Sequence, residues 1–258
     1  MSKHTIFKPV FNLIAILFLA SCEFVTGQGP IVTKQMKVQS FDAIELDGSF
    51  NVELNQGTVQ KVVAEGQENI IEKLVLEVQD DVLHLRLKPG NYRNFKLTVK
   101  ITVPTIEGMN LSGSGDISIG TFVELEKLEV ELDGSGDIRT EGAMEVLNNV
   151  EIDLDGSGDI KLKLKAVKVE ADLDGSGIII LEGKTDKLEV SLDGSGDINT
   201  YDLKASKSEA SIGGSGDIRV YASDKLDASI SGSGDIRYKG NPEVESEVDG
   251  SGTVKASN

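Results

Sequence analysis

The chain has 258 residues, and its 43 Asp and Glu outnumber its 26 Lys and Arg, which gives a formal net charge of −17 at pH 7. A chain this acidic, with no basic run, is unsuited to nucleic acid, whose phosphates attract cations. It holds a single Cys, which excludes an intramolecular disulfide, so that stability has to come from packing and hydrogen bonds.

Residues 1–21 are predicted to be a lipoprotein signal peptide. Lys3 and Lys8 form a positive start, and residues 10–20 are apolar but too short to span a bilayer comfortably. The run Leu-Ala-Ser-Cys that ends at Cys22 resembles a bacterial lipobox, in which the Cys becomes the first residue and is lipidated. Two or more acyl chains on Cys22 would anchor the protein to a membrane. The alternative is an ordinary signal peptide with an incidental Cys.

Residues 22–35, which include Gly27, Gly29 and Pro30, are expected to form a short tether. Residues 36–258 are predicted to be a single β-solenoid domain, with an irregular N-terminal part at 36–105 and repeat coils at 106–258. No long linker is expected between the membrane and the folded body.

The irregular part contains recognisable elements. Residues 44–52 follow the pattern of the later repeats, with Phe50 in place of a glycine, and are predicted to be a degenerate first coil. Residues 74–78 and 82–87 flank a polar turn and predict a hairpin, residues 95–103 predict a strand, and residues 68–73 one helical turn. This part is expected to cap one end of the solenoid, because open sheet ends invite edge pairing.

The tripeptide Gly-Ser-Gly recurs eight times in the rest of the chain at intervals of 18–22 residues. It begins at Gly113, Gly134, Gly156, Gly175, Gly194, Gly214, Gly232 and Gly250. A fixed period of about 20 residues is typical of a stacked repeat architecture, in which no unit is stable alone. A propeller is the main rival, but its blades need about 40–50 residues.

Apolar columns around the tripeptide define the predicted fold. The positions two before the first Gly and four after it are Leu, Ile or Val in all eight repeats, and apolar residues alternate with polar ones nearby. Alternation indicates strands, and parallel coils would stack about 4.8 Å apart. We therefore predict an all-β protein, a parallel β-helix or β-solenoid with about eight regular coils and an irregular N-terminal β cap. The glycines would supply either a left-handed φ or room in a crowded corner. The serine side chains would stack as a polar ladder that satisfies backbone groups of the turn.

The sequence resembles a known family at several points. The segments Ile-Glu-Leu-Asp-Gly-Ser-Phe-Asn-Val from Ile44, Val-Lys-Ile-Thr-Val-Pro from Val99 and Leu-Ser-Gly-Ser-Gly-Asp-Ile from Leu111 are similar to the head GIN domain family, described as putative auto-transporter adhesins. The resemblance covers nearly all of the chain after the signal peptide. It implies a parallel β-helix in a bacterial envelope protein, and it carries no catalytic motif.

An Asp follows the turn in six repeats: Asp116, Asp137, Asp159, Asp197, Asp217 and Asp235. Calcium-binding rolls need Gly-Gly-x-Gly-x-Asp every nine residues, and neither the spacing nor the phase fits here. We expect each Asp to accept turn N–H groups instead. Ile178 and Thr253 replace the Asp in the other two repeats.

A second acidic column precedes the turn and is the candidate cation or partner face. It comprises Glu129, Glu151, Glu170, Glu189, Glu209, Asp227 and Glu245. Two neighbouring columns add Glu131, Asp153, Asp172 and Glu247, and Asp133, Asp155, Asp174, Asp193 and Asp249. Stacked carboxylates about 4.8 Å apart repel by about 1 kcal/mol per pair even in water. The columns form either a solvated, aggregation-resistant face or a surface that collects divalent cations or a cationic partner.

Two further readings concern sugars. Tyr201 and Tyr221 occupy equivalent repeat positions and are the candidate glycan contact, although an aromatic ladder packed on a loop explains them as well. Many β-helices cleave acidic polysaccharides, but the only His after the signal peptide is His84, and no carboxylate pair stands out from the repeat. No catalytic residue, metal-ligand set or cofactor is predicted.

The sequence therefore predicts a lipid-anchored, non-enzymatic envelope protein that acts as a surface adhesion or interaction module. The outer membrane is favoured over the inner one. Expected partners are the membrane, through the lipid, and an envelope protein or glycan, with divalent cations as weakly bound candidates and no nucleic acid. A polysaccharide-active β-helix enzyme and a purely structural envelope component are the alternatives.

Overall fold

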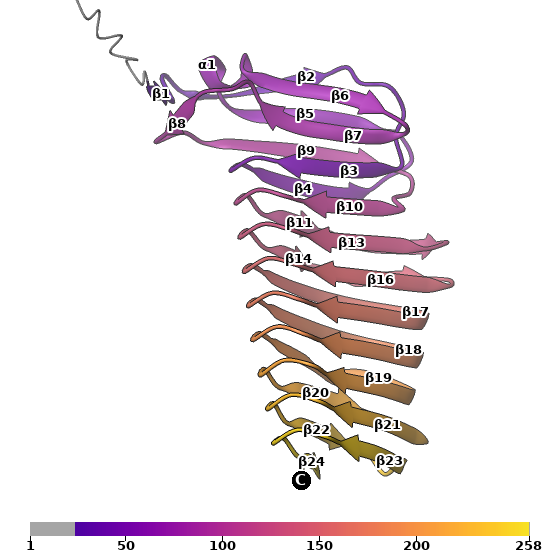
Figure 1. The fold of residues 1–258 in the computed structure, drawn as a ribbon. Coiled ribbons are helices and arrows are strands. Elements are labelled where there is room, and N and C mark those ends of the chain that lie inside the picture. Colours follow the sequence, from indigo (N-terminus) through magenta and orange to yellow (C-terminus); the bar gives the residue numbers. More distant parts are fainter. Residues whose placement is uncertain (1–23, 258) are drawn as a thin grey trace, which may run out of the picture.

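The computed structural model describes residues 24–257, of which most lie in strands. The chain is nearly all-β, with 62% strand and 2% helix, and its coils stack into a parallel β-solenoid of about seven turns below an N-terminal cap (Figure 1). This confirms the predicted fold class. The eight Gly-Ser-Gly corners line one edge of the stack, and about seven turns separate the first corner from the last.

Each coil has three strand positions. The first strand enters the Gly-Ser-Gly corner, the second leaves it, and the third returns toward the next coil. The first regular coil shows them as β10 (Gly108–Leu111), β11 (Ile117–Ile119) and β12 (Phe122–Leu125), and the next coil starts with β13 (Leu128–Leu132). We call the corresponding outer surfaces the entry face, the exit face and the return face.

The remaining strands continue these three stacks in parallel. In the middle coils the three positions merge into long bent strands, which are β17 (Asp159–Leu173), β18 (Ile178–Leu192) and β19 (Asp197–Ile212). The others are β14 (Ile138–Thr140), β15 (Met144–Val146), β16 (Asn149–Leu154), β20 (Ile218–Tyr221), β21 (Lys225–Ile230), β22 (Ile236–Lys239), β23 (Glu243–Val248) and β24 (Val254–Ala256).

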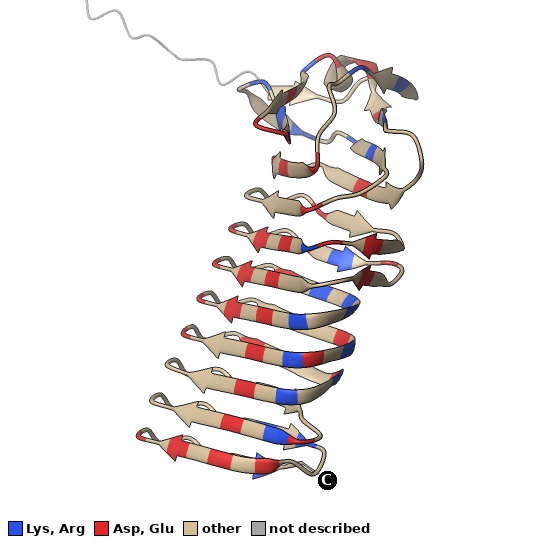
Figure 2. Cartoon of the chain, turned by 90° about the vertical axis from the view of Figure 1, so that its right-hand side faces the viewer, with Lys and Arg blue, Asp and Glu red and all other residues tan. Residues whose placement is uncertain are grey.

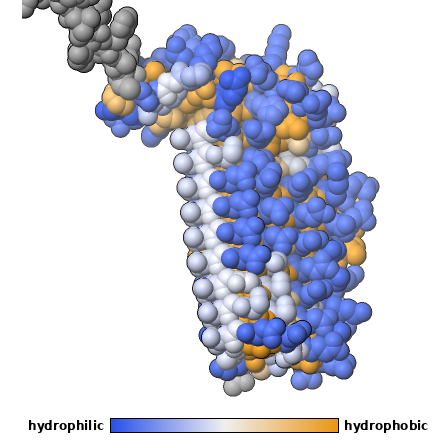
Figure 3. Space-filling view, in the orientation of Figure 1, coloured by the Kyte–Doolittle hydropathy of each residue, from blue (hydrophilic) through white to orange (hydrophobic). Residues whose placement is uncertain are grey.

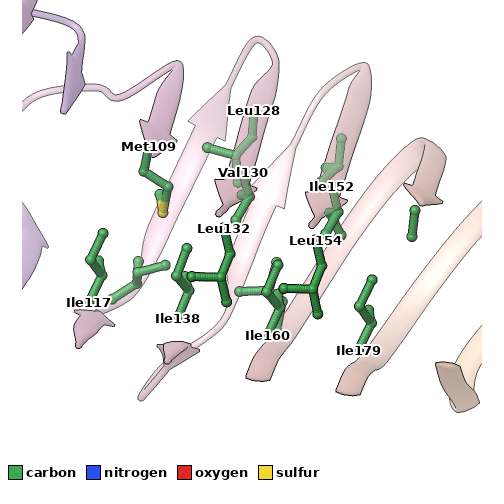
Figure 4. Packing of buried hydrophobic residues seen from close by; sticks show 14 of the residues in the cluster. Met109, Ile117, Leu128, Val130, Leu132, Ile138, Ile152, Leu154, Ile160 and Ile179 are labelled. Atoms are coloured by element: carbon green, nitrogen blue, oxygen red, sulfur yellow. The ribbon is translucent and has the colours of Figure 1, made fainter. Parts of the chain in front are cut away.

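The predicted apolar columns form the core. Leu111, Leu132 and Leu154 pair coil to coil in the register and are fully buried. Ile117, Ile138 and Ile160 of the exit strands lie beside the leucine column in the same core (Figure 4). These apolar residues alternate with exposed polar ones, so each strand has one face in the core and the other in solvent. The columns weaken only at the last coil, where Val248 is 42% exposed.

The glycines of the corner are required by crowding between coils. None of them has a left-handed φ, but a Cβ on Gly134 would lie 2.0 Å from the carbonyl oxygen of Gly113, and one on Gly136 1.8 Å from that of Gly115. Of the two reasons that the sequence left open, close approach is therefore the right one. The corners form a continuous pale ridge along one edge of the molecule (Figure 3).

The serines of the corner act through their backbone. The N–H of Ser135 donates to the carbonyl oxygen of Gly113 at 3.0 Å, and the same bond recurs from coil to coil. Within the described residues, no hydroxyl of these serines hydrogen-bonds to the turn backbone, so the predicted side-chain ladder is wrong in its mechanism. Stacked amides already satisfy the turn, which leaves the hydroxyls to solvent.

The N-terminal cap is not sequential along the stack. β3 (Ala43–Asp47) and β4 (Asn51–Gln56) form the predicted degenerate coil and pair with β10 and β11 below. Above them lie β7 (Val82–Leu87) and β9 (Leu97–Val103), which come later in the chain. After β3 and β4, the chain therefore first builds the strands above them and only then continues with β10 below them.

Antiparallel strands close the upper end. The hairpin of β6 (Leu74–Gln79) and β7 is confirmed, and so is the helical turn, α1 (Glu68–Ile71), which buries Ile70 and Ile71. β5 (Lys61–Gln67) runs antiparallel to β9. Antiparallel pairing ends the parallel stack and covers its apolar edge.

The predicted tether is partly wrong. β2 (Ile31–Met36) pairs with β5 along six residues, so all of residues 31–35 belong to the cap sheet. β1 (Phe24–Thr26) also pairs, with β8 (Asn91–Arg93). The glycines and polar side chains suggested a linker, but backbone hydrogen bonds order these residues without a strong apolar pattern. Within residues 24–257, no helix is long and apolar enough to cross a membrane.

Candidate interaction face

The entry face collects the predicted acidic column into one continuous ladder. The register pairs Glu129 with Glu151, Glu151 with Glu170, and so on through Glu189, Glu209, Asp227 and Glu245. Figure 2 shows these acids as aligned bands down the coils. All seven predicted residues therefore lie on one face, and what they bind stays a prediction.

A lysine ladder lies beside this column and was missed from the sequence. It consists of Lys127, Lys168, Lys187, Lys207 and Lys225, each two residues before an acid of the column. Lys168 Nζ lies 2.9 Å from Glu170 Oε2 and 2.5 Å from Glu189 Oε2, and Lys187 also pairs with Glu189. Hydrogen bonds from these two lysines lower the pKa of Glu189. The fixed two-residue offset was readable in the repeat.

The same compensation recurs lower in the stack. Lys225 Nζ lies 2.9 Å from Asp227 Oδ1 and 3.2 Å from Glu245 Oε2, and these contacts raise the pKa of Lys225. Exposed pairs of this kind add little stability. Their main consequence is electrostatic, because they neutralise part of the column that the sequence singled out.

The middle column keeps its charge unpaired. Glu131 stacks on Asp153 and Asp153 on Asp172, between the acidic columns on either side. Among the described residues no Lys or Arg pairs with these three carboxylates. Partial burial raises the pKa of Asp153 to about 6, and the charges of Asp172 and Glu131 add to the rise. Burial and the neighbouring acids raise the pKa of Asp172 as well. The carboxylates that have no Lys or Arg partner are therefore gathered at the centre of the face.

The raised pKa of Asp153 predicts a pH dependence of stability. The folded state binds the proton more tightly than the unfolded chain, whose carboxyl titrates near the ordinary value of 3.8. Stability should therefore rise as the pH falls from above 6 toward 4. Melting temperatures at constant ionic strength should show this rise, and Asp153→Asn should flatten it.

Asp133→Asn is the matched control for this measurement, since Asp133 is an exposed acid in the adjacent column. It should leave the slope between pH 6 and pH 4 nearly unchanged. Equal slopes in the two variants would contradict a special role for Asp153.

The aspartates after the turn have a structural role, as the sequence predicted. Asp137 Oδ1 accepts the N–H of Asp159 at 3.1 Å, and Asp217 Oδ1 accepts that of Asp235 at 3.0 Å. Ile178 and Thr253 take the last place in such a chain, where they donate an N–H but offer no carboxylate. Each of these carboxylates therefore joins its coil to the next one by a hydrogen bond.

Arginines offset the charge of these aspartates. Arg237 lies 2.7 Å from Asp217 Oδ2 and 2.7 Å from Asp235 Oδ2. Burial alone would raise the pKa of Asp217, but the N–H of Asp235 and the Arg237 guanidinium together lower it. The column is satisfied internally and offers no open ligand set.

The two candidate glycan contacts are covered by cations. Lys239 Nζ lies 4.3 Å from the ring centroid of Tyr201, and Lys204 Nζ lies 4.0 Å from that of Tyr221. An ammonium over the ring face competes with a sugar for the same surface. Glycan binding at Tyr201 and Tyr221 stays a prediction.

One hollow in the cap mixes acids with bases. It has a volume of about 220 Å³ and is lined in part by Glu45, Glu77, His84 and Arg86. His84 Nδ1 lies 3.0 Å from Glu45 Oε2, and Arg86 pairs with Glu77 at 3.0 Å. A hollow that brings acids and bases together, outside the regular acidic columns, would favour an enzyme. Here, however, His84 and Arg86 are each paired with an acid.

Within residues 24–257, no group of three or more His, Cys, Asp and Glu side chains is arranged to hold a metal ion. Cys22, the predicted lipidation site, lies outside the described residues.

Comparison with protein families gives one match. The family described as "Putative auto-transporter adhesin, head GIN domain" matches residues 40–149 and 142–242, which together span most of the chain. None of the curated proteins matches the chain.

Several solved structures share the fold over nearly their whole length. A putative lipid binding protein from Parabacteroides distasonis is 29% identical over 92% of this chain and 100% of its own, with a TM-score of 0.85. A putative adhesin from Parabacteroides merdae is 25% identical over 91% and 99%, with a TM-score of 0.82. A putative adhesin from Bacteroides fragilis is 28% identical over 90% and 99%, with a TM-score of 0.66.

Proposed function

Since the chain belongs to the head GIN domain family of putative auto-transporter adhesins, we propose that it is a non-enzymatic adhesion module held at the bacterial cell envelope. The observation that carries this proposal is the unpaired acidic centre of the entry face, formed by Glu131, Asp153 and Asp172. A rigid wall of carboxylates without matching cations favours a basic partner, whose ammonium groups would relieve their mutual repulsion. Two relatives named as adhesins support the class of function.

The partner we propose is a cationic polymer of the envelope, such as a lysine-rich protein segment or an amino sugar polymer. Binding would release the repulsion among stacked carboxylates and should weaken with salt, because exposed charges are screened beyond about 10 Å at 0.1 M. Regular spacing of coils lets a linear polymer meet the same chemistry at every level.

The test measures binding of poly-L-lysine to the protein at 0.05 and 0.15 M salt. The triple variant Glu131→Gln, Asp153→Asn, Asp172→Asn should weaken binding by about tenfold or more, since three close contacts are removed. A control with Glu72→Gln, Glu126→Gln and Asp202→Asn removes three exposed acids elsewhere and the same net charge. Equal losses in the two variants would mean that net charge alone acts, and the proposal would fail.

The divalent-cation alternative has its own measurement. Millimolar Ca²⁺ or Mg²⁺ at constant ionic strength should raise the melting temperature if the entry face collects these ions, because a ligand of the folded state stabilises it. An unchanged melting temperature would restrict the face to organic cations.

Envelope anchoring is proposed through Cys22. Cells fed an alkyne analogue of palmitate should label the protein, and Cys22→Ser should abolish the label and release the protein from the membrane fraction. Persistent labelling of the Cys22→Ser variant would contradict this anchor. Fractionation of the two membranes would test the proposed outer-membrane location.

A second candidate, a polysaccharide-active enzyme, is favoured only by the hollow around His84 and Glu45. Reducing-end release from acidic polysaccharides, lost in His84→Gln, would support it. No release would leave the binding module as the function.

A further inference from the structure

The return face carries an apolar groove that neither the acidic columns nor the corners explain. It lies across the return strands of four successive coils, where β12, β15 and the middle parts of β17 and β18 run side by side, and its volume is about 370 Å³. Small-molecule sites occupy roughly 300–1,000 Å³ and are mostly apolar with a few polar groups. The groove fits the small end of that range, and its walls are predominantly apolar.

Two irregularities shape the groove. The inward column of the return strands runs Phe122, Met144, Leu164, Gly183 and Leu203. Gly183 breaks this column because it contributes no side chain, and its φ of +124° excludes most other residues. The pairing of β12 with β15 also shifts register. The floor of the groove is thus fixed by backbone geometry.

Val123 is held at the groove in an exposed position. It is 44% exposed, yet its backbone is fully satisfied, since its N–H donates to Gln56 Oε1 and its carbonyl accepts from Gln56 Nε2, both at 3.0 Å. A large apolar side chain pinned outward at the edge of an apolar groove offers contact area that nothing in the described structure uses.

Cations rim the groove in an otherwise acidic protein. Lys163, Lys165 and Lys184 are exposed and line it, and the register stacks Lys165 on Lys184 and Lys184 on Lys204. Lys165 is offset by Glu145 at 2.6 Å, and Lys204 lies over Tyr221. Within the described residues, neither Lys163 nor Lys184 forms an ion pair, although Glu182 stands opposite Lys163 in the register. Two ammonium groups that are not held in an ion pair therefore stand beside an apolar surface.

We propose that this groove binds a long-chain amphiphile with an anionic headgroup, of the fatty-acid class. The apolar chain would lie along Val123, Ala143 and the aliphatic stems of the lysines, and the carboxylate would lie between Lys163 and Lys184. Charge complementarity selects this occupant, because a neutral apolar ligand leaves the lysines unpaired and a sugar finds few polar partners on the walls. The inference is independent of the entry face.

The experiment uses the protein from residue 24 onward, which contains the whole described core. Two solved relatives align over 99–100% of their own chains with 91–92% of this one, so a protein that begins at residue 24 keeps about the length that those chains have in their crystals. The probe is 11-(dansylamino)undecanoate, titrated below its micelle concentration and followed by fluorescence. We expect saturable one-to-one binding, competed by decanoate at least tenfold better than by decanol. Removing two methylenes from the competitor should weaken it several-fold.

Matched variants distinguish probe binding in the groove from non-specific binding elsewhere on the surface. Val123→Glu should weaken probe binding by tenfold or more, whereas Val167→Glu, at a valine that is 51% exposed outside the groove, should not. Lys163→Gln with Lys184→Gln should erase the preference for decanoate over decanol. Lys61→Gln with Lys73→Gln, two exposed lysines away from the groove, should keep it. Circular dichroism confirms that each variant is folded.

The proposal is overturned if the unaltered protein does not bind the probe, or if Val123→Glu binds it as tightly as Val167→Glu. Equal competition by decanoate and decanol before any substitution would overturn the anionic headgroup. Binding that appears only above the micelle concentration counts as absence of binding.

Discussion

Gly158→Ala is expected to lower the free energy of unfolding by about 3 kcal/mol, the upper part of the range for overpacked sites. The added Cβ would lie 1.8 Å from the carbonyl oxygen of Gly136, which belongs to the backbone of the coil above. Neither backbone can retreat, because the stacked corners hydrogen-bond to each other on both sides. Denaturation by urea, monitored by circular dichroism, measures the loss.

Ser157→Ala is the control for this substitution, because it changes the neighbouring residue of the same corner. Ser157 is exposed and contributes its backbone N–H to the ladder, which Ala retains. Its effect should stay within about 0.5 kcal/mol. A loss below about 1 kcal/mol in Gly158→Ala would mean that the corner is loose, and the crowding argument would be wrong.

The solenoid was predictable because the apolar pattern that produces it is short and recurs in every repeat. Leu154 and Ile160 stand at fixed distances from the same tripeptide as their equivalents in the other coils, and alternation alone decides which side chains turn inward. Stacking then follows, since an apolar column can only be buried against its own repeats. The alignment of the acidic columns is a consequence of the same register.

The cap was predictable in its elements and unpredictable in its order. The hairpin of β6 and β7 and the turn α1 depend on nearby residues, and both were found. The placement of β7 above β3, however, depends on pairing between strands about 40 residues apart, and nothing local marks it. The same limit explains the tether, where β2 is ordered by its partner β5.

The candidate sites divide in the same way. The lysine ladder obeys the repeat, so the offset of Lys168 before Glu170 was available in the sequence and was overlooked. The groove could not be read in that way, because it depends on a register shift in the return strands and on the left-handed φ of Gly183, which the sequence does not mark. Function on a repeat scaffold is best sought where the periodicity fails.

Phe50→Ala is expected to lower the free energy of unfolding by about 3–5 kcal/mol, the usual loss for a buried aromatic side chain. Phe50 replaces the second glycine of the degenerate corner, and its side chain is buried. It fits because the level above runs from β7 to β9 through β8 and lacks a tight corner, so the crowding that imposes glycine on the other coils is absent. Chemical denaturation measures the loss.

Phe24→Ala provides the comparison, since this phenylalanine is 48% exposed and lies under the guanidinium of Arg93, so its loss should cost less than about 1 kcal/mol.

The number of unfolding transitions is as informative as the midpoint. One hydrophobic cluster runs from Phe41 in the cap to Ile236 near the last coil, so Phe50→Ala should shift a single transition. A repeat stack can also uncouple, because each coil touches only its neighbours. Two transitions would show that the cap folds independently of the coils, and Phe50 would then be the joint between two units.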